Sequence, residues 1–114
     1  MVKILQLLNK TEIIKSYEIQ DFKHGEDFYY IKVQAKLVNE TTLFIREYAS
    51  EEDYNYSYHW QEDNSQLIIR WDNAPHHKQI KTFPHHKHIG EKVLPSYEIG
   101  IHEVLTYIDI ILKN

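Results

Sequence analysis

Histidine is the residue type in this chain whose spacing most clearly points to chemistry. Five of the eight histidines lie within thirteen residues. They are His76, His77, His85, His86 and His88. An imidazole titrates near pH 6.5, so it can act as a general acid or a general base at neutral pH, and it is also a common metal ligand. We therefore predict that residues 70–88 form the functional site.

The tripeptide Pro-His-His occurs twice, at residues 75–77 and 84–86. Each proline fixes its own φ and biases the residue before it towards extended geometry. Neighbouring side chains of an extended chain point in opposite directions, so one histidine of each pair can face a common site. His86 and His88 would share a face on an extended segment. We take all five clustered histidines as candidate catalytic residues, with Asp72 orienting one of them.

Positive charge is concentrated in the same part of the chain. Residues 70–92 carry a net charge of +3 before any histidine charge, and the remaining residues carry −7. Such a basic island suits one bound anion or a short nucleic-acid strand better than a long duplex. The candidate substrate-binding residues are Arg46, Arg70, Lys87, Tyr58, His59 and Asn73. Arginine can bind phosphate through two hydrogen bonds, and aromatic rings at positions 54–60 can stack on bases.

These residues leave three functions open. Metal-free RNA cleavage needs a base for the 2′-hydroxyl, an acid for the departing 5′-oxygen and a cation on the phosphate. A zinc or manganese site on His86, His88 and Asp72 would instead support metal-assisted phosphodiester hydrolysis. We favour the first, and so expect no cofactor, because no helical HExxH motif is present and carboxylates are few nearby. A non-catalytic module that binds an anionic partner is the third hypothesis.

Composition excludes several classes of protein. The absence of cysteine rules out disulfides, thiolate catalysis and cysteine-ligated zinc. No apolar run approaches the roughly 20 residues of a membrane span. The apolar patch near the N-terminus has no small-residue cleavage site after it. We therefore expect a cytoplasmic protein with no membrane segment, forming a single domain over residues 1–114.

Hydrophobic periodicity predicts the elements that must position the histidines. Helical spacing covers residues 4–14 and resumes at Tyr97, with Ser96 as a candidate N-cap. Alternation typical of strands covers residues 16–23, 28–38, 42–49, 54–61 and 66–72. Residues 73–90 have no steady periodicity and are predicted to form a long loop. The expected fold is α+β, an antiparallel five- or six-stranded meander sheet with N- and C-terminal helices packed on one face. Glu47 interrupts the apolar face of its strand, either as a buried acid or at the sheet rim.

Several segments together resemble the TumE family of bacterial and archaeal toxins. They read SYEI at 16–19, FIREY at 44–48, YSYHWQ at 56–61, LIIRWDNAPHH at 67–77, TFPHHKHIG at 82–90 and PSYE at 95–98. The resemblance implies the toxic half of a type II toxin–antitoxin pair, with a TumA-type DNA-binding antitoxin that neutralises it by direct contact. It supplies no mechanism, so RNA as the substrate and ribonuclease activity are expectations from the residue chemistry alone. Exposed strands also leave a homodimer open.

Overall fold

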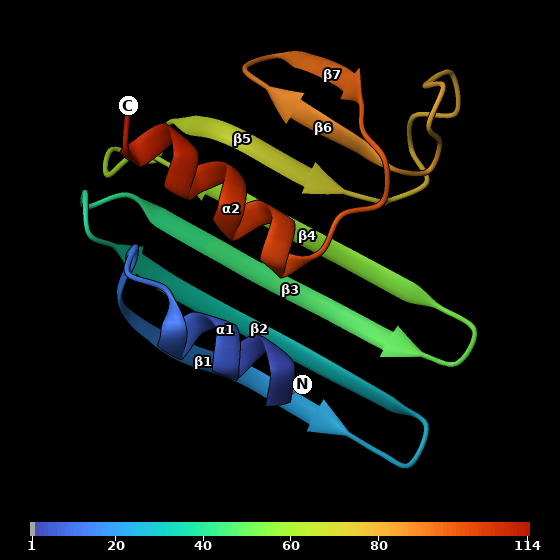
Figure 1. Ribbon diagram of the computed structural model, residues 1–114. Coiled ribbons are helices and arrows are strands. Elements are labelled where there is room, and N and C mark those ends of the chain that lie inside the picture. Colours follow the sequence, from blue (N-terminus) through green and yellow to red (C-terminus); the bar gives the residue numbers. More distant parts are fainter. Residues whose placement is uncertain (1) are drawn as a thin grey trace.

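Seven strands and two helices build the part of the chain that the computed structural model describes, residues 2–114. The helices are α1 (Val2–Lys10) and α2 (Ile101–Leu112). The strands are β1 (Ile14–His24), β2 (Phe28–Leu37), β3 (Thr42–Ser50), β4 (Tyr54–Gln61), β5 (Leu67–Asp72), β6 (His86–Ile89) and β7 (Lys92–Pro95). Each strand pairs antiparallel with the next, giving one meander sheet in the order β1 to β7 (Figure 1).

Both helices cover the same face of this sheet (Figure 1). Ile4 and Leu8 of α1 and Val104 and Ile108 of α2 belong to one buried core with the apolar side chains of β2 to β5. Full burial of each such side chain stabilises the fold by about 1.5–3 kcal/mol. The predicted α+β meander with both terminal helices on one face is therefore confirmed, and the sheet has seven strands.

The additional strands arise inside the segment that we expected to be a loop. β6 and β7 are four residues each, too short for alternation to stand out. A tight turn joins them, and its Gly90 has φ of 60°, a left-handed conformation that glycine adopts without steric cost. The prediction of a loop up to residue 90 is thus wrong from His86 onwards, because a hairpin extends the sheet there.

The helix boundaries also differ from those expected. α1 ends at Lys10, and Ile14 is the first residue of β1. α2 begins at Ile101, where the Glu103 carboxylate accepts a hydrogen bond of 2.8 Å from the Gly100 N–H. The expectation of Ser96 as N-cap is wrong, because the Ser96 N–H instead donates to the Thr82 hydroxyl at 2.9 Å. Among residues 2–114, neither helix is long and apolar enough to cross a bilayer.

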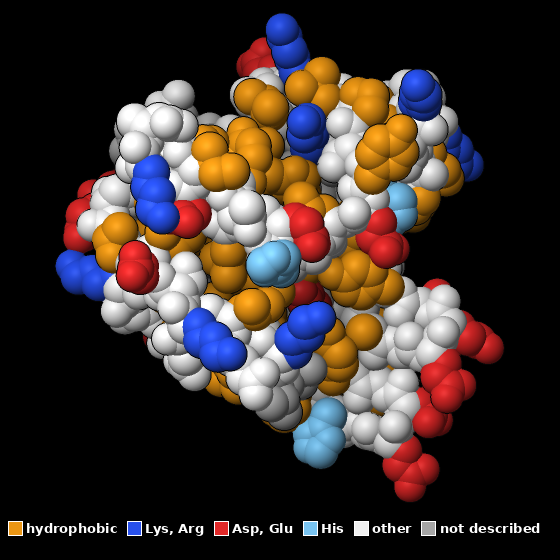
Figure 2. All heavy atoms as spheres, in the orientation of Figure 1, with side chains coloured by type: hydrophobic (Ala, Val, Ile, Leu, Met, Phe, Trp, Pro, Cys, Tyr) orange, Lys and Arg blue, Asp and Glu red, His pale blue; other side chains and the backbone are white. Residues whose placement is uncertain are grey.

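The two faces of the sheet differ in character. Val33, Ile45, Tyr58 and Trp71 lie in one register row on the helix face and are buried. Figure 2 views the molecule from this side, where hydrophobic side chains lie between and beside the helices and acidic ones gather over the turns at the lower right. Neither α1 nor α2 covers the opposite face (Figure 1). It carries the polar rows that contain most of the candidate site.

Glu47 is a buried acid on the helix face, 4% exposed, which answers the question that its sequence position left open. Its carboxylate accepts hydrogen bonds from the hydroxyls of Tyr58 and Tyr29, the second at 3.1 Å, and the Tyr54 and Tyr58 hydroxyls lie 2.8 Å apart. Burial and the neighbouring Glu47 charge raise the pKa of Tyr29 to about 12 and raise that of Tyr58 further. The partners of this acid are tyrosines, with no arginine or lysine bonded to it in residues 2–114.

Replacing Glu47 with alanine is expected to lower the free energy of unfolding by about 2–3 kcal/mol, because the buried Tyr58 hydroxyl loses its acceptor. Urea denaturation followed by circular dichroism measures the change. Glu51→Ala, in an exposed turn, is the matched control and should stay within about 0.5 kcal/mol of the wild type. A Glu47→Ala variant as stable as this control would contradict the role of the network.

Candidate functional site

Asp72 lies at the centre of the candidate site, at the end of β5 and buried at 6% exposure. Its Oδ1 accepts the Ala74 N–H at 3.0 Å, and its Oδ2 accepts the Arg70 Nε–H at 3.0 Å. The Nε2 atoms of His86 and His88 lie 3.0 Å and 3.4 Å from the two carboxylate oxygens. Four neighbours therefore share one carboxylate.

The pairing of strands brings these groups together. Asp72 is opposite His86, and Arg70 is opposite His88, in the β5–β6 register. Side chains two residues apart on a strand share a face, so all four point to the face without helices. The predicted common face of His86 and His88 is confirmed.

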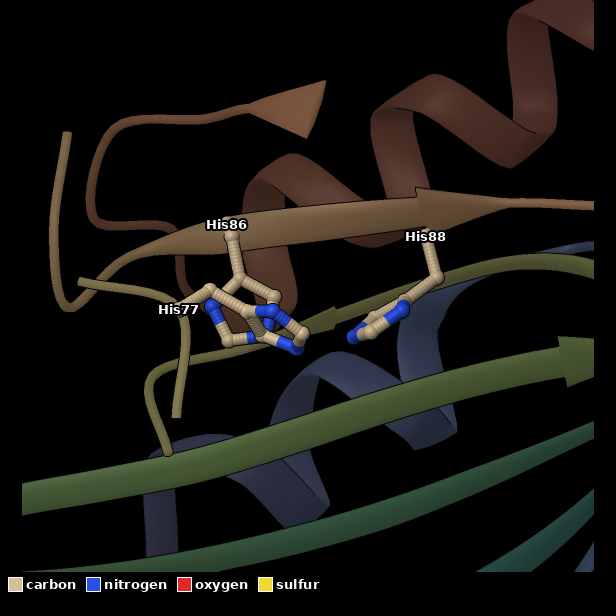
Figure 3. Close-up of side chains that lie close together, drawn as sticks. All are labelled: His77, His86 and His88. Atoms are coloured by element: carbon tan, nitrogen blue, oxygen red, sulfur yellow. The ribbon is translucent and has the colours of Figure 1, made fainter. Parts of the chain in front are cut away.

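His77 completes a cluster with His86 and His88, each offering a ring nitrogen within 4.8 Å of the others. His86 and His88 project from β6, and His77 approaches from the loop after β5 (Figure 3). The ring centroids lie 4.8 Å apart for His77–His86 and His86–His88, and 5.6 Å apart for His77–His88. One histidine of each Pro-His-His motif thus meets the same site, as the sequence predicts.

Both ring nitrogens of His86 face acceptors. Its Nδ1 lies 2.9 Å from the Pro84 carbonyl oxygen, and its Nε2 lies 3.0 Å from Asp72. Because a carbonyl oxygen can only accept, Nδ1 carries a proton, and Nε2 is the nitrogen that faces the cluster. The Pro84 carbonyl therefore fixes both the tautomer and the orientation of this buried ring.

The electrostatics of the cluster oppose the accumulation of positive charge. Burial lowers the pKa of His88, and the neighbouring His86, His77 and Arg70 lower it further against the opposing pull of Asp72. Burial by itself raises the pKa of Asp72, but the Ala74 N–H, Arg70 and His86 together hold it below its usual range. An ionised carboxylate beside a neutral His88 is the form that these shifts favour.

Arg70 also contacts His59, one strand away on the same face. The Arg70 Nη1 donates to His59 Nδ1 at 3.3 Å, so His59 Nε2 carries the proton and donates to the Gln61 Oε1 at 3.0 Å. Burial and the Arg70 charge lower the pKa of His59. His59 is thus held neutral, with its ring orienting the arginine.

Two adjoining hollows lie beside the cluster on the face without helices, with volumes of about 290 and 310 Å³. Arg46, Ser57 and Arg70 line both of them. Arg46 is exposed and sits opposite Ser57 in the sheet, which in turn sits opposite Asp72. The two arginines therefore lie where the hollows adjoin, and Arg70 is bonded to the Asp72 carboxylate.

Four of the predicted site residues, His76, His85, Tyr58 and Lys87, lie away from this arrangement, and Asn73 lines the first hollow but has a structural role. His76 is exposed outside the cluster, and the His85 Nδ1 is 2.8 Å from the Tyr56 hydroxyl. Tyr58 is fully buried on the helix face, in the same register row as Lys87. The Asn73 side chain bonds the backbone of β4, accepting from the Tyr56 N–H and donating to the Tyr54 carbonyl oxygen.

Sequence reasoning missed the aromatic residues that do line the hollows. Tyr30 and Tyr48 border the first hollow, and Phe44 borders the second beside His59. The signal was present in the alternation, because Phe44, Arg46 and Tyr48 fall on one face of β3, opposite the apolar Leu43 and Ile45. Base stacking was expected of the aromatic side chains at positions 54–60, which instead belong to the core or pack against it.

Comparison with known proteins now adds to this geometry. The family model for the toxin TumE matches residues 4–112. The chain belongs to the TumE toxin family. Both Pro-His-His motifs, and with them the whole cluster of His77, His86 and His88, fall inside the matched region. No curated protein and no solved structure matches the chain significantly. Membership of the TumE family makes the protein the toxin of a toxin–antitoxin pair and implies a cognate antitoxin.

Proposed function

We propose that this TumE toxin is an endoribonuclease that cleaves single-stranded RNA on the face of the sheet without helices. The observation that carries the proposal is the position of Arg46 and Arg70. They border both hollows, and Arg70 is bonded directly to Asp72 within the histidine cluster. A phosphate bound by the two arginines would lie next to groups that transfer protons.

The charges on this face favour a phosphodiester over other anions. Lys32 is opposite Arg46 in the register, Arg70 lies in the neighbouring row, and all three cations line the second hollow. The guanidinium fork of arginine matches two phosphate oxygens at once. A group of cations around one hollow, with aromatic rings beside it, suits the backbone of a single strand.

The walls of the hollows favour bases on either side of that phosphate. Tyr30 and Tyr48 line the first hollow, and Phe44 and His59 line the second, with the last two rings in edge-to-face contact at 6.0 Å. Base stacking on an aromatic ring contributes about 1–3 kcal/mol per base. Each hollow is at the small end of the size range for ligand sites, which suits one nucleoside each. Unpaired RNA can present its bases in this way, whereas a duplex cannot.

Within the cluster, the three histidines differ in access to a bound phosphate. His88 is 25% exposed and His77 is half-buried, whereas His86 is 2% exposed. We assign the contact with substrate to His77 and His88, and we assign positioning to His86 and Asp72. We also propose that the toxin acts in the cytoplasm and meets its cognate antitoxin there. The antitoxin would block this face or hold the toxin away from RNA.

The test is an RNA cleavage assay with the purified protein and end-labelled single-stranded RNA. We expect discrete shorter products from the wild type and none from a His77→Gln/His88→Gln variant. His102→Gln, on the exposed side of α2, is the matched control and should cleave like the wild type. Cleavage that persists in the folded double variant, or its absence from the wild type, would overturn the proposal.

A further inference from the structure

The three clustered imidazole rings are spaced about as far apart as the ligands of one metal ion, and each offers a ring nitrogen within 4.8 Å of the others. Three imidazoles bound to a tetrahedral ion through nitrogen atoms about 2.05 Å from it place their ring centroids about 5.2 Å apart. The centroids of His77, His86 and His88 lie 4.8, 4.8 and 5.6 Å apart. Their planes are inclined to one another by 67–75°, so no pair stacks face to face.

The immediate surroundings have the features of a second shell of a metal site. His86 donates its Nδ1–H to the Pro84 carbonyl oxygen, which leaves Nε2 directed into the cluster. A hydrogen bond from the second ring nitrogen to a carbonyl or carboxylate is the usual support of a metal-bound histidine. The rings of His86 and His88 hang from β6 towards His77, with the nitrogen of His88 pointing at the other two (Figure 3).

We propose that His77, His86 and His88 bind one divalent transition-metal ion of the zinc class, with the fourth coordination position open. The ion would bind at the Nε2 atoms of His86 and His88, and the Asp72 carboxylate, 3.0 and 3.4 Å from those atoms, would balance its charge. Three histidines with one open position are typical of catalytic zinc rather than structural zinc.

The ligand type sets the class of ion. Imidazole nitrogen suits zinc, copper, iron and nickel, whereas magnesium and calcium prefer oxygen ligands. Two of the three ligands are held in place, because His86 and His88 lie on a strand that is paired on both sides. His77 is the ligand that the loop after β5 contributes.

The proposed metal site does not depend on the proposed ribonuclease activity. Only a role of the ion in RNA cleavage rests on that activity. With the ion bound, His77 and His88 would act on the substrate through it rather than by direct contact. The ion would polarise a phosphate oxygen beside Arg70, a chemistry that the sequence left as the second choice after metal-free cleavage. The sequence proposal for ligands also changes, since His77 joins His86 and His88, and Asp72 becomes their charge-balancing neighbour.

The test is a titration of the metal-stripped full-length protein with zinc and with cobalt, without RNA. We expect one zinc ion per chain by isothermal titration calorimetry, and visible absorption bands of tetrahedral cobalt. His77→Gln and His88→Gln should each weaken zinc binding by more than about a hundredfold, since even outer-shell partners contribute about 10–100-fold. His102→Gln should bind like the wild type, and magnesium should not compete.

Failure to bind zinc, or equal binding by the cluster variants and the His102→Gln control, would overturn the metal site. RNA cleavage by the metal-stripped protein in excess EDTA would show that the ion has no part in the reaction and would leave the ribonuclease proposal standing. A protein that binds one zinc ion per chain but cleaves no RNA would support the metal site and overturn the ribonuclease proposal.

Discussion

Arg70→Gln is expected to slow RNA cleavage by about 10²–10³-fold, the usual effect of losing one preorganised donor to the charge that develops in a transition state. Arg70 stands between the hollows, and Asp72 and His59 both hold its guanidinium in place. Initial rates on a short labelled RNA measure the effect. Arg70→Lys keeps the charge but loses the fork, so its rate should lie between those of the wild type and Arg70→Gln.

Lys10→Gln is the control for this substitution, because it removes an exposed cation from α1 on the other side of the sheet. It should leave the cleavage rate unchanged, which separates a local effect of Arg70 from a general loss of attraction for RNA. Arg46→Gln should slow cleavage in the same direction as Arg70→Gln. A folded Arg70→Gln variant with the wild-type rate would mean that the substrate phosphate lies elsewhere.

Asp72→Asn is expected to lower the free energy of unfolding at pH 7 by about 2–4 kcal/mol and to abolish cleavage. The amide has one acceptor oxygen where the carboxylate has two, so its NH₂ group must face either the Arg70 Nε–H or the Ala74 N–H. It also leaves a half-buried arginine without its countercharge. Urea denaturation measures the stability, and Asp109→Asn, which breaks only an exposed pair with Lys113, should change it by less than about 1 kcal/mol.

The difference in the free energy of unfolding between the wild type and Asp72→Asn should depend on pH. The pKa of Asp72 is depressed in the folded protein by the Ala74 N–H, Arg70 and His86 acting against burial. Its stabilising contribution is therefore complete above the unfolded pKa of about 3.9 and is lost as the pH falls through the folded value. The two proteins should approach each other in stability below pH 4. A gap that stays constant from pH 7 to pH 3 would contradict this assignment.

Strand alternation was enough to predict much of the site. It predicted the strand over residues 42–49 that carries Phe44 and Arg46, and the two-residue spacing of His86 and His88 assigned both to one face of an extended segment. The proline motifs indicated that one histidine of each pair could face a common site, and His77 and His86 lie in one cluster, although all five histidines were taken as candidates. These are local properties, since the period of an extended chain depends only on the backbone.

The remaining features depend on contacts that are distant in sequence. Both faces of the sheet carry aromatic rings, and only the packing of the helices decides that Tyr58 is core while Tyr48 stays accessible. His85 is taken out of the cluster by a hydrogen bond to Tyr56, a residue 29 positions earlier. The β6–β7 hairpin exists because β5 offers an edge for pairing, which four-residue segments do not reveal by themselves.

The number of RNA cuts per protein molecule tests the central claim most directly. With a single-stranded RNA in hundredfold excess over purified protein, an enzyme built on Arg46, Arg70 and the histidine cluster should cut many substrate molecules per chain. The His77→Gln/His88→Gln variant, folded and at the same concentration, should cut none. RNA that is bound by the wild type but stays intact would contradict the account and identify the same face as a binding surface.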